Sequence, residues 1–321
     1  MKQKDKIKLP KVIKGYLSYL QSIKGATSQT VNAYAYDLIL FFRFLKIHYG
    51  DIDEDCPFEN ICIKDIDSDF VKDIELYDIY AFLAYLQNER DNTSTTRARK
   101  VACLKSFFKY ACKKGKILDY DLGAELESPK ISKKLPVYLT LEESKKLIAS
   151  VNSRNYQRDK CIIILFLNTG MRLSELCGIN ISSIRGDTLI VKGKGNKERL
   201  VYLNESCINE INRYLRVRKK KENQIKDGSK DALFISEQKR RISKRAVEDV
   251  VNNAIKNAGL SDNYSVHKLR HTAATIMYRS GADIRSLQTI LGHESVATTQ
   301  IYTHVKEDQL RDIVNSNPLN D

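Results

Sequence analysis

Apolar residues recur at three- and four-residue spacings through the first part of the chain. The stretch SQTVNAYAYDLILFFRFL, residues 28–45, has this spacing, and Ser28 is its predicted N-cap. Residues 76–90 follow the same pattern, and residues 93–115 begin with hydroxyl side chains that suit a helix N-terminus. The pattern predicts an all-helical domain over residues 1–126.

The periodicity stops at residues 127–138, which contain two prolines and several lysines and are predicted to be a linker. The second domain, residues 139–321, has a mixed pattern. A continuous apolar run predicts a buried helix over residues 161–170, and residues 187–203 form two strand-like runs around a turn, which predicts a β-hairpin. Residues 232–236 are expected to add a strand. The fold class predicted is mainly α with a small β-sheet, in two domains.

The net charge of the chain indicates a class of binding partner. The chain has 54 Lys and Arg against 40 Asp and Glu, a net charge of +14. Neutralising phosphates releases condensed counterions, so this excess favours a nucleic acid partner, although a basic surface kept for solubility is the alternative.

The cysteines and the apolar segments indicate the compartment. Seven cysteines at scattered spacings without CxxC indicate free thiols in a reducing cytoplasm. The longest apolar run is too short to span a bilayer, and no signal peptide precedes it. We expect a cytoplasmic protein without a membrane segment, metal site or cofactor.

Four of the five histidines fall in the last quarter of the chain. His267, Arg270 and His271 are spaced i, i+3, i+4, which places them on one face of a helix. A zinc-binding helix has similar spacing, but Lys268 stands where the metalloprotease pattern needs Glu. A polar face that meets solvent is the simpler alternative.

Two further positions supply cations. Arg172 follows the glycine that ends the apolar helix, and Glu175 lies three residues on, so Arg172 is placed either to clamp an oxyanion or to form a surface pair. The predicted hairpin turn is either an ordinary charged turn or an arm that reaches into a groove. Its cations are Lys192, Lys194, Lys197 and Arg199.

His293 and Tyr302 lie nine residues apart, so on one unbroken helix they would face about 180° apart. Gly292 as a helix stop and Ser295 as a new N-cap would break that helix and let the two side chains converge.

Together these residue types suit a phosphodiester. Two arginines would neutralise the non-bridging oxygens in the transition state. A tyrosine whose proton is accepted by a neighbour is a nucleophile, and a lysine can protonate the leaving 5′-oxygen. No cluster of carboxylates stands out, which counts against two-metal chemistry.

The motifs TGMRLSEL, KGKGNKERL, HKLRHTAAT and LGHESVATTQIYTHV, in this order, resemble the tyrosine recombinase (phage integrase) family, closest to its Xer-type members. The resemblance covers nearly the whole chain. It implies a C-shaped clamp of two domains, a helical core-binding domain and a mixed α/β catalytic domain, around double-stranded DNA. It also implies cleavage through a 3′-phosphotyrosine without metal or ATP.

By the same resemblance, the catalytic residues would be Arg172, Lys194, His267, Arg270, His293 and Tyr302, with Glu175 and His271 in support. Lys192 and Lys197 remain alternatives to Lys194. DNA contacts are expected from the starts of two helices and from the hairpin: Thr96, Arg97, Arg99, Lys100, Lys197, Arg199, Lys244 and Arg245.

Chemistry on two duplexes implies a homotetramer, or a heterotetramer with a related recombinase. The resemblance implies that the C-terminal tail docks on a neighbouring subunit. Within the family, a Xer-like role on chromosome dimers is favoured because the chain begins almost directly with the core-binding-like helices. A compact integrase of a phage or mobile element is the alternative. A type IB-like topoisomerase and a DNA-binding protein without cleavage are weaker hypotheses.

Overall fold

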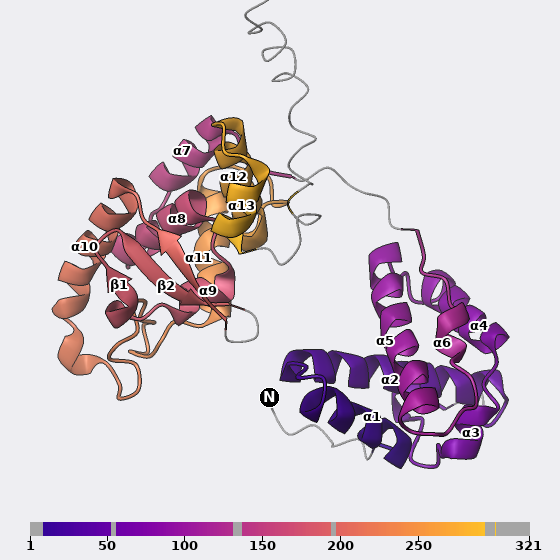
Figure 1. The fold of residues 1–321 in the computed structure, drawn as a ribbon. Helices are drawn as coiled ribbons and strands as arrows, with labels where there is room; N and C mark the ends of the chain where they lie inside the picture. The colour runs from indigo at the N-terminus through magenta and orange to yellow at the C-terminus, as the bar shows by residue number, and fades with distance from the viewer. Residues whose placement is uncertain (1–8, 53–55, 131–136, 194–196, 293–298, 300–321) are drawn as a thin grey trace, which may run out of the picture. The chain divides into compact units, whose positions relative to one another are not determined.

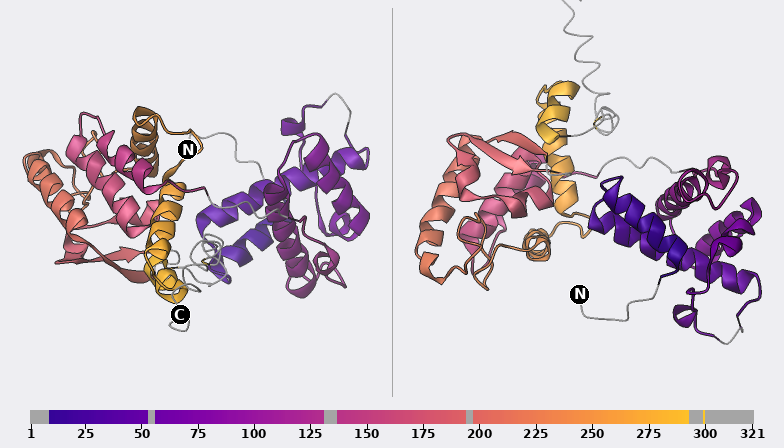
Figure 2. Two further views of the ribbon diagram at one scale, coloured as in Figure 1. Left: turned by 90° about the horizontal axis from the view of Figure 1, so that it is seen from above. Right: turned by 60° about the horizontal axis from the view of Figure 1, so that its bottom comes forward.

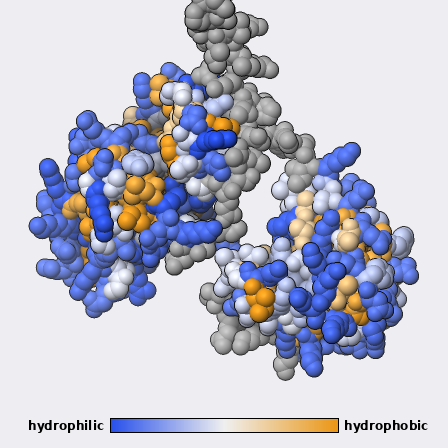
Figure 3. Space-filling model, in the orientation of Figure 1, coloured by the Kyte–Doolittle hydropathy of each residue, from blue (hydrophilic) through white to orange (hydrophobic). Residues whose placement is uncertain are grey.

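The computed structural model describes residues 9–52, 56–130, 137–193, 197–292 and 299. The chain divides into two compact units, unit 1 (Met1–Lys133) and unit 2 (Lys134–Asp321), with their boundary inside the predicted linker. Hydrophilic residues cover most of the face drawn in Figure 3. Across the described ranges, no helix is both long and apolar enough to cross a membrane.

Unit 1 is helical, as the spacing of apolar residues predicts (Figure 1). Its core is rich in aromatic residues: Phe41 and Phe42 on the second helix lie buried with Phe107 and Phe108 on the fifth. The elements are α1 (Lys11–Ser22), α2 (Ser28–His48), η1 (Phe58–Asn60), α3 (Ser68–Lys72), α4 (Leu76–Asn88), α5 (Ser94–Lys113) and α6 (Leu122–Glu125).

The predicted N-cap at Ser28 is wrong by one residue. The Thr27 hydroxyl accepts the Thr30 N–H, so Ser28 is the first residue inside α2. Thr93 caps α5 in the same way through the N–H of Thr96. A hydroxyl at the cap satisfies one of the N–H groups that a helix leaves unpaired at its start.

Unit 2 is built around α8, whose residues from Cys161 to Leu167 are all buried. The helix packs between α10 and α12, which explains why its apolar run shows no polar face (Figure 1). The helices are α7 (Leu141–Ala149), α8 (Tyr156–Thr169), α9 (Leu173–Gly178), η2 (Ile181–Ser183), α10 (Glu205–Lys219), η4 (Glu222–Gln224), α11 (Lys244–Asn257), α12 (Val266–Arg279) and α13 (Ile284–Leu291).

The sheet of unit 2 is antiparallel, in the order β1 (Ile184–Arg185), β2 (Thr188–Lys192) and β3 (Glu198–Tyr202). The predicted hairpin is therefore confirmed, with Val191 opposite Arg199. Residues 232–236 do not form a strand, because only isolated bridges at Ala232 and Ile235 pair this stretch.

The last helices of the described chain pack together. Helices α12 and α13 lie side by side at one end of unit 2 (Figure 2). Gly292 ends α13 in the left-handed conformation, with φ of 64°, as predicted for a helix stop. This helix end faces the residues that the sequence singled out.

Candidate active site

Arg172 lies in the short connection between α8 and α9. Helix α8 ends at Gly170, whose φ of 59° favours glycine. A side chain there would also place its Cβ 2.8 Å from Cδ2 of Leu291. Gly170 therefore permits both the turn and the close approach of α13, which together set the position of Arg172.

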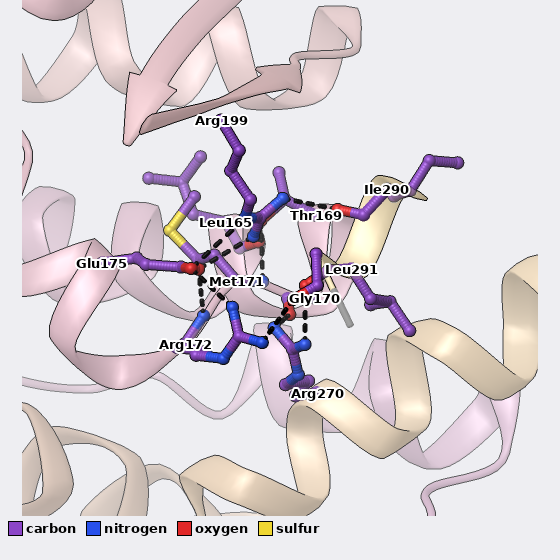
Figure 4. A network of polar contacts seen from close by, with 11 residues as sticks. Leu165, Thr169, Gly170, Met171, Arg172, Glu175, Arg199, Arg270, Ile290 and Leu291 are labelled. Atoms are coloured by element: carbon purple, nitrogen blue, oxygen red, sulfur yellow. Dashed lines mark hydrogen bonds and ion pairs between the residues drawn. The ribbon is translucent and has the colours of Figure 1, made fainter. Parts of the chain in front are cut away.

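Glu175 is held by two arginines from different elements (Figure 4). Its carboxylate accepts from the Arg172 backbone N–H at 2.7 Å and from Arg172 Nη1 at 2.8 Å. From β3, Arg199 donates to both oxygens, through Nη2 at 2.8 Å and Nε at 3.2 Å. Burial alone would raise the pKa of Glu175, but Arg199 and then Arg172 hold it below its ordinary value. Glu175 is therefore a buried anion that orients both guanidinium groups.

The last carbonyl groups of α13 are each bound by a different arginine (Figure 4). The Ile290 carbonyl accepts from Arg199 Nη1. The Leu291 carbonyl accepts from Arg270 Nη2 at 2.7 Å, and the Gly292 carbonyl from Arg172 Nη2 at 2.6 Å. A helix leaves its final carbonyls without intrahelical partners, and cations are favourable at this end of the helix dipole. The arginines therefore cap α13.

Arg270 reaches the same place from α12. Its side chain is buried, with 4% of its surface exposed, and Nη1 donates to the Gly170 carbonyl at 2.6 Å. Arg270 thus bridges the ends of α8 and α13. It shares a pocket with Arg172 and His267, so the structure brings these three predicted catalytic residues together.

The two histidines of α12 contact each other, with ring centroids 4.8 Å apart. Partial burial, followed by the charges of Arg270 and Arg172, lowers the pKa of His267 below its ordinary value. Burial lowers the pKa of His271 further, to about 4. Both rings are therefore neutral at neutral pH, and His271 packs edge-on against His267 on the same helix.

Lys194, His293 and Tyr302 lie outside the described residues. The chain next to Lys194 approaches the site, because a Cβ on Gly193 would lie 3.5 Å from Glu175 Oε1. Gly193 N–H also donates to the Lys197 carbonyl at 2.8 Å, which closes the described base of the turn. The alternative lysines lie on either side, both exposed: Lys192, with Glu198 3.6 Å away, and Lys197.

The predicted DNA contacts divide into two groups. Lys244 and Arg245 are exposed at the start of α11 and line the pocket that holds Arg172 and Arg270. Thr96 is engaged in the cap of α5, and Arg97 donates to the Asn92 carbonyl at 2.7 Å. Arg99 remains exposed while it binds Asp37.

Two predicted DNA contacts need correction. Lys100 is buried and donates to Asp37 at 2.8 Å, so its ammonium group is turned into unit 1. Arg199 has a side chain 14% exposed and is bound to Glu175 and Ile290. The sequence did carry a signal for Arg199: along β3 it shares the inward face with buried Val201, two residues on.

Comparison with known proteins gives this arrangement a family. Residues 137–309 match the model of the phage integrase family. The chain is 51% identical to "Tyrosine recombinase XerC" of Caldanaerobacter subterraneus subsp. tengcongensis over 98% of this chain and 89% of that protein. It is 36% identical to the protein of the same name from Corynebacterium glutamicum, over 96% of this chain and 92% of that one.

Solved structures share the fold. The crystal structure of XerA recombinase matches with a TM-score of 0.50 and 28% identity, covering 95% of this chain and 96% of that chain. A post-cleavage complex of XerH recombinase bound to a difH substrate matches with a TM-score of 0.67 and 23% identity, covering 95% and 84%. The predicted fold class is confirmed: mainly helical with a small sheet, in two domains.

Proposed function

The chain belongs to the phage integrase family and is a Xer-like tyrosine recombinase, a site-specific enzyme that cleaves and rejoins DNA, and we propose that Tyr302 is its nucleophile. One observation carries the assignment of the site. Arg172 and Arg270, which are far apart in sequence, line one pocket together with His267.

In this proposal the scissile phosphate binds at the pocket between the two arginines. A guanidinium group carries five N–H donors in a fixed plane, and the contacts of Arg172 to Glu175 and Gly292 use two of them. The site is therefore suited to stabilise negative charge on the non-bridging oxygens as the transition state forms. Neutral His267 adds a hydrogen bond to the same phosphate.

The reaction balances without an external energy source. The Tyr302 oxygen attacks phosphorus, the bond from phosphorus to the 5′-oxygen breaks, and Lys194 protonates that oxygen. His293 accepts or orients the phenolic proton. The product is a 3′-phosphotyrosine and a free 5′-hydroxyl, and attack by a 5′-hydroxyl from the partner duplex reverses the step with exchanged strands.

Double-stranded DNA is the proposed partner, and a homotetramer or a heterotetramer with a related recombinase is the proposed assembly. The net charge of +14 and the exposed Lys244 and Arg245 beside the pocket support DNA binding. Solved structures with this fold include a lambda integrase tetramer bound to a Holliday junction, with 21% identity and a TM-score of 0.61. We further propose a cytoplasmic location and docking of the C-terminal tail on a neighbouring subunit.

The relatives favour a Xer role over that of a mobile element. Relatives named XerC match almost the whole chain, so we propose action on chromosome dimers. A phage or mobile-element integrase is the second candidate. Sequencing the DNA bound by the protein in cells would distinguish them, because a chromosomal site should recur once per replicon and an element's site should lie at its ends.

The test of the chemistry is Tyr302→Phe on a nicked duplex that carries the bound site. We expect wild-type protein to accumulate a covalent protein–DNA adduct and Tyr302→Phe to bind the same DNA without forming any adduct. Tyr202→Phe, on an exposed strand position, is the matched control and should react normally. Adducts formed by Tyr302→Phe would refute the assignment, and relaxation of a plasmid without the site would favour a topoisomerase.

A further inference from the structure

Arg199 joins three parts of unit 2. It comes from β3, binds Glu175 from the side opposite Arg172, and binds the Ile290 carbonyl at the end of α13 (Figure 4). Glu175 in turn binds Arg172. A continuous chain of charged groups therefore runs from the hairpin through Glu175 to Arg172.

Both ends of this series of charged groups bind carbonyl groups at the end of α13. Arg199 holds the Ile290 carbonyl, and Arg172 holds the Gly292 carbonyl at 2.6 Å. These two acceptors lie one on each side of the Leu291 carbonyl, which Arg270 holds. The arginines that face the phosphate pocket and the end of α13 are thus tied to one another through Arg199 and Glu175.

Gly292 allows this arrangement. A Cβ at Gly292 would lie 2.7 Å from Cδ and 3.0 Å from Nε of Arg199, and 3.6 Å from Nη1 of Arg172. The Arg199 side chain therefore packs directly against Gly292, the residue that caps the end of α13. A displacement of Arg199 would shift this residue, from which the polypeptide continues to His293 and Tyr302.

We propose that Arg199 is a positioning residue for strand cleavage, which fixes the end of α13 and the Glu175–Arg172 pair in one register; this proposal rests on the recombinase function proposed above. Arg199 is not a phosphate contact itself, because its guanidinium is shielded and bound to Glu175 and Ile290. Its effect is to place groups that react.

The planar guanidinium is required for this role. Arg199 uses Nε and Nη2 on Glu175 and Nη1 on Ile290, so donors that point in different directions act at once. A lysine has a single nitrogen, which would satisfy one partner well and the other poorly. Arg199→Lys should therefore restore part of what Arg199→Ala loses.

The test measures single-turnover adduct formation on saturating nicked DNA, together with DNA affinity and thermal unfolding. We expect Arg199→Ala to lower the rate constant roughly 100-fold, the size of effect seen when a reacting group is misplaced, with DNA affinity near that of wild type. Arg199→Lys should recover part of the rate. Arg213→Ala is the matched control, since the Arg213 side chain on α10 is exposed and its partner Glu210 keeps Lys160 3.7 Å away, and it should react as wild type does.

A pH profile separates positioning from general stabilisation. Arg199 lowers the pKa of Glu175, so its removal should raise that pKa and move the acidic limb of the rate profile to higher pH. A purely structural role would instead lower the amplitude, meaning the fraction of molecules that react, at an unchanged rate constant and an unchanged acidic limb.

The outcomes are distinct. The proposal is overturned if Arg199→Ala reacts at the wild-type rate, or if only the reacting fraction falls. The proposed function fails, independently of Arg199, if wild-type protein forms no adduct, and the assignment of Tyr302 as nucleophile fails if Tyr302→Phe forms one.

Discussion

Asp37 in unit 1 and Glu175 in unit 2 are buried carboxylates that are each held by two cations, yet of these two only Glu175 lies beside the pocket proposed to bind the phosphate. In unit 1, Asp37 binds Arg99 and Lys100, which are consecutive residues of α5. In unit 2, Glu175 binds Arg172 and Arg199, which come from the start of α9 and from β3. The charges are the same in number and sign.

The difference lies in what else the cations reach. The cluster at Asp37 joins α5 to α2, and both of its cations end on the carboxylate. At Glu175, both arginines continue to the carbonyls of α13, and Arg172 also lines the pocket with Arg270. A carboxylate held by two cations can therefore either stabilise the packing of two helices or position the cations to bind an anion. Which of the two it does depends on where the remaining donors of the cations point.

The largest effect should come from substituting Arg172, because this change disrupts the Glu175 cluster beside the proposed phosphate pocket. Arg172→Ala removes the proposed donor to the scissile phosphate and should slow adduct formation roughly a thousandfold, because the transition-state charge loses direct stabilisation. DNA affinity should fall little, since many phosphates contribute to it. Single-turnover cleavage and a DNA-binding titration check both statements, and a parallel loss of affinity and rate would contradict them.

Asp37→Ala disrupts the other cluster, in which Asp37 binds Arg99 and Lys100 of unit 1. It would leave the Lys100 ammonium buried without its carboxylate, and removing one partner of a buried pair should lower the free energy of unfolding of unit 1 by about 3 kcal/mol. Denaturant unfolding of the full chain measures this. Asp69→Ala, which breaks an exposed pair with Lys72, is the control and should change stability very little. Equal losses in the two variants would show that burial at Asp37 is unimportant.

Gly292→Ala tests the geometry that distinguishes the two clusters. The added Cβ would meet Arg199, so we expect adduct formation to slow roughly 100-fold through misplaced groups. Gly259→Ala is the matched control, because Gly259 also has a left-handed φ of 59°, but a Cβ at that position would have open space within 4 Å among the described residues. Both variants share the backbone cost of about 1 kcal/mol, so equal activity in the two would rule out the steric explanation.

The smallest effect concerns pH. The pKa of His271 is about 4 in the folded protein, below the ordinary value of about 6.5, so the unfolded chain binds this proton more readily. Stability contributed by the neutral ring is present above pH 6.5 and is lost as the pH falls towards 4. His271→Asn should reduce the loss of melting temperature over this window, and an NMR titration should find His271 neutral at pH 5. The same acid sensitivity in both proteins would be inconsistent with this.

The sequence alone determined the elements and part of the site. Apolar spacing located α2, α4 and α5 of unit 1, and the alternation around a turn located the hairpin, because these periods follow from local backbone geometry. Arg172 and Glu175 are three residues apart at a helix start, so their contact was also foreseeable from local geometry. The cap of α2 was misplaced by one residue because adjacent Thr27 and Ser28 offer equivalent hydroxyls.

Only the tertiary structure decided which cations are available to a ligand. Lys100 and Arg199 resemble their exposed neighbours in the sequence, but Asp37 and Glu175, from distant segments, draw them inward. A helix end always leaves carbonyls to be satisfied, and the sequence does not say which donors will satisfy them. Three arginines, from the start of α9, from β3 and from α12, meet at the end of α13, and this long-range meeting makes the candidate site.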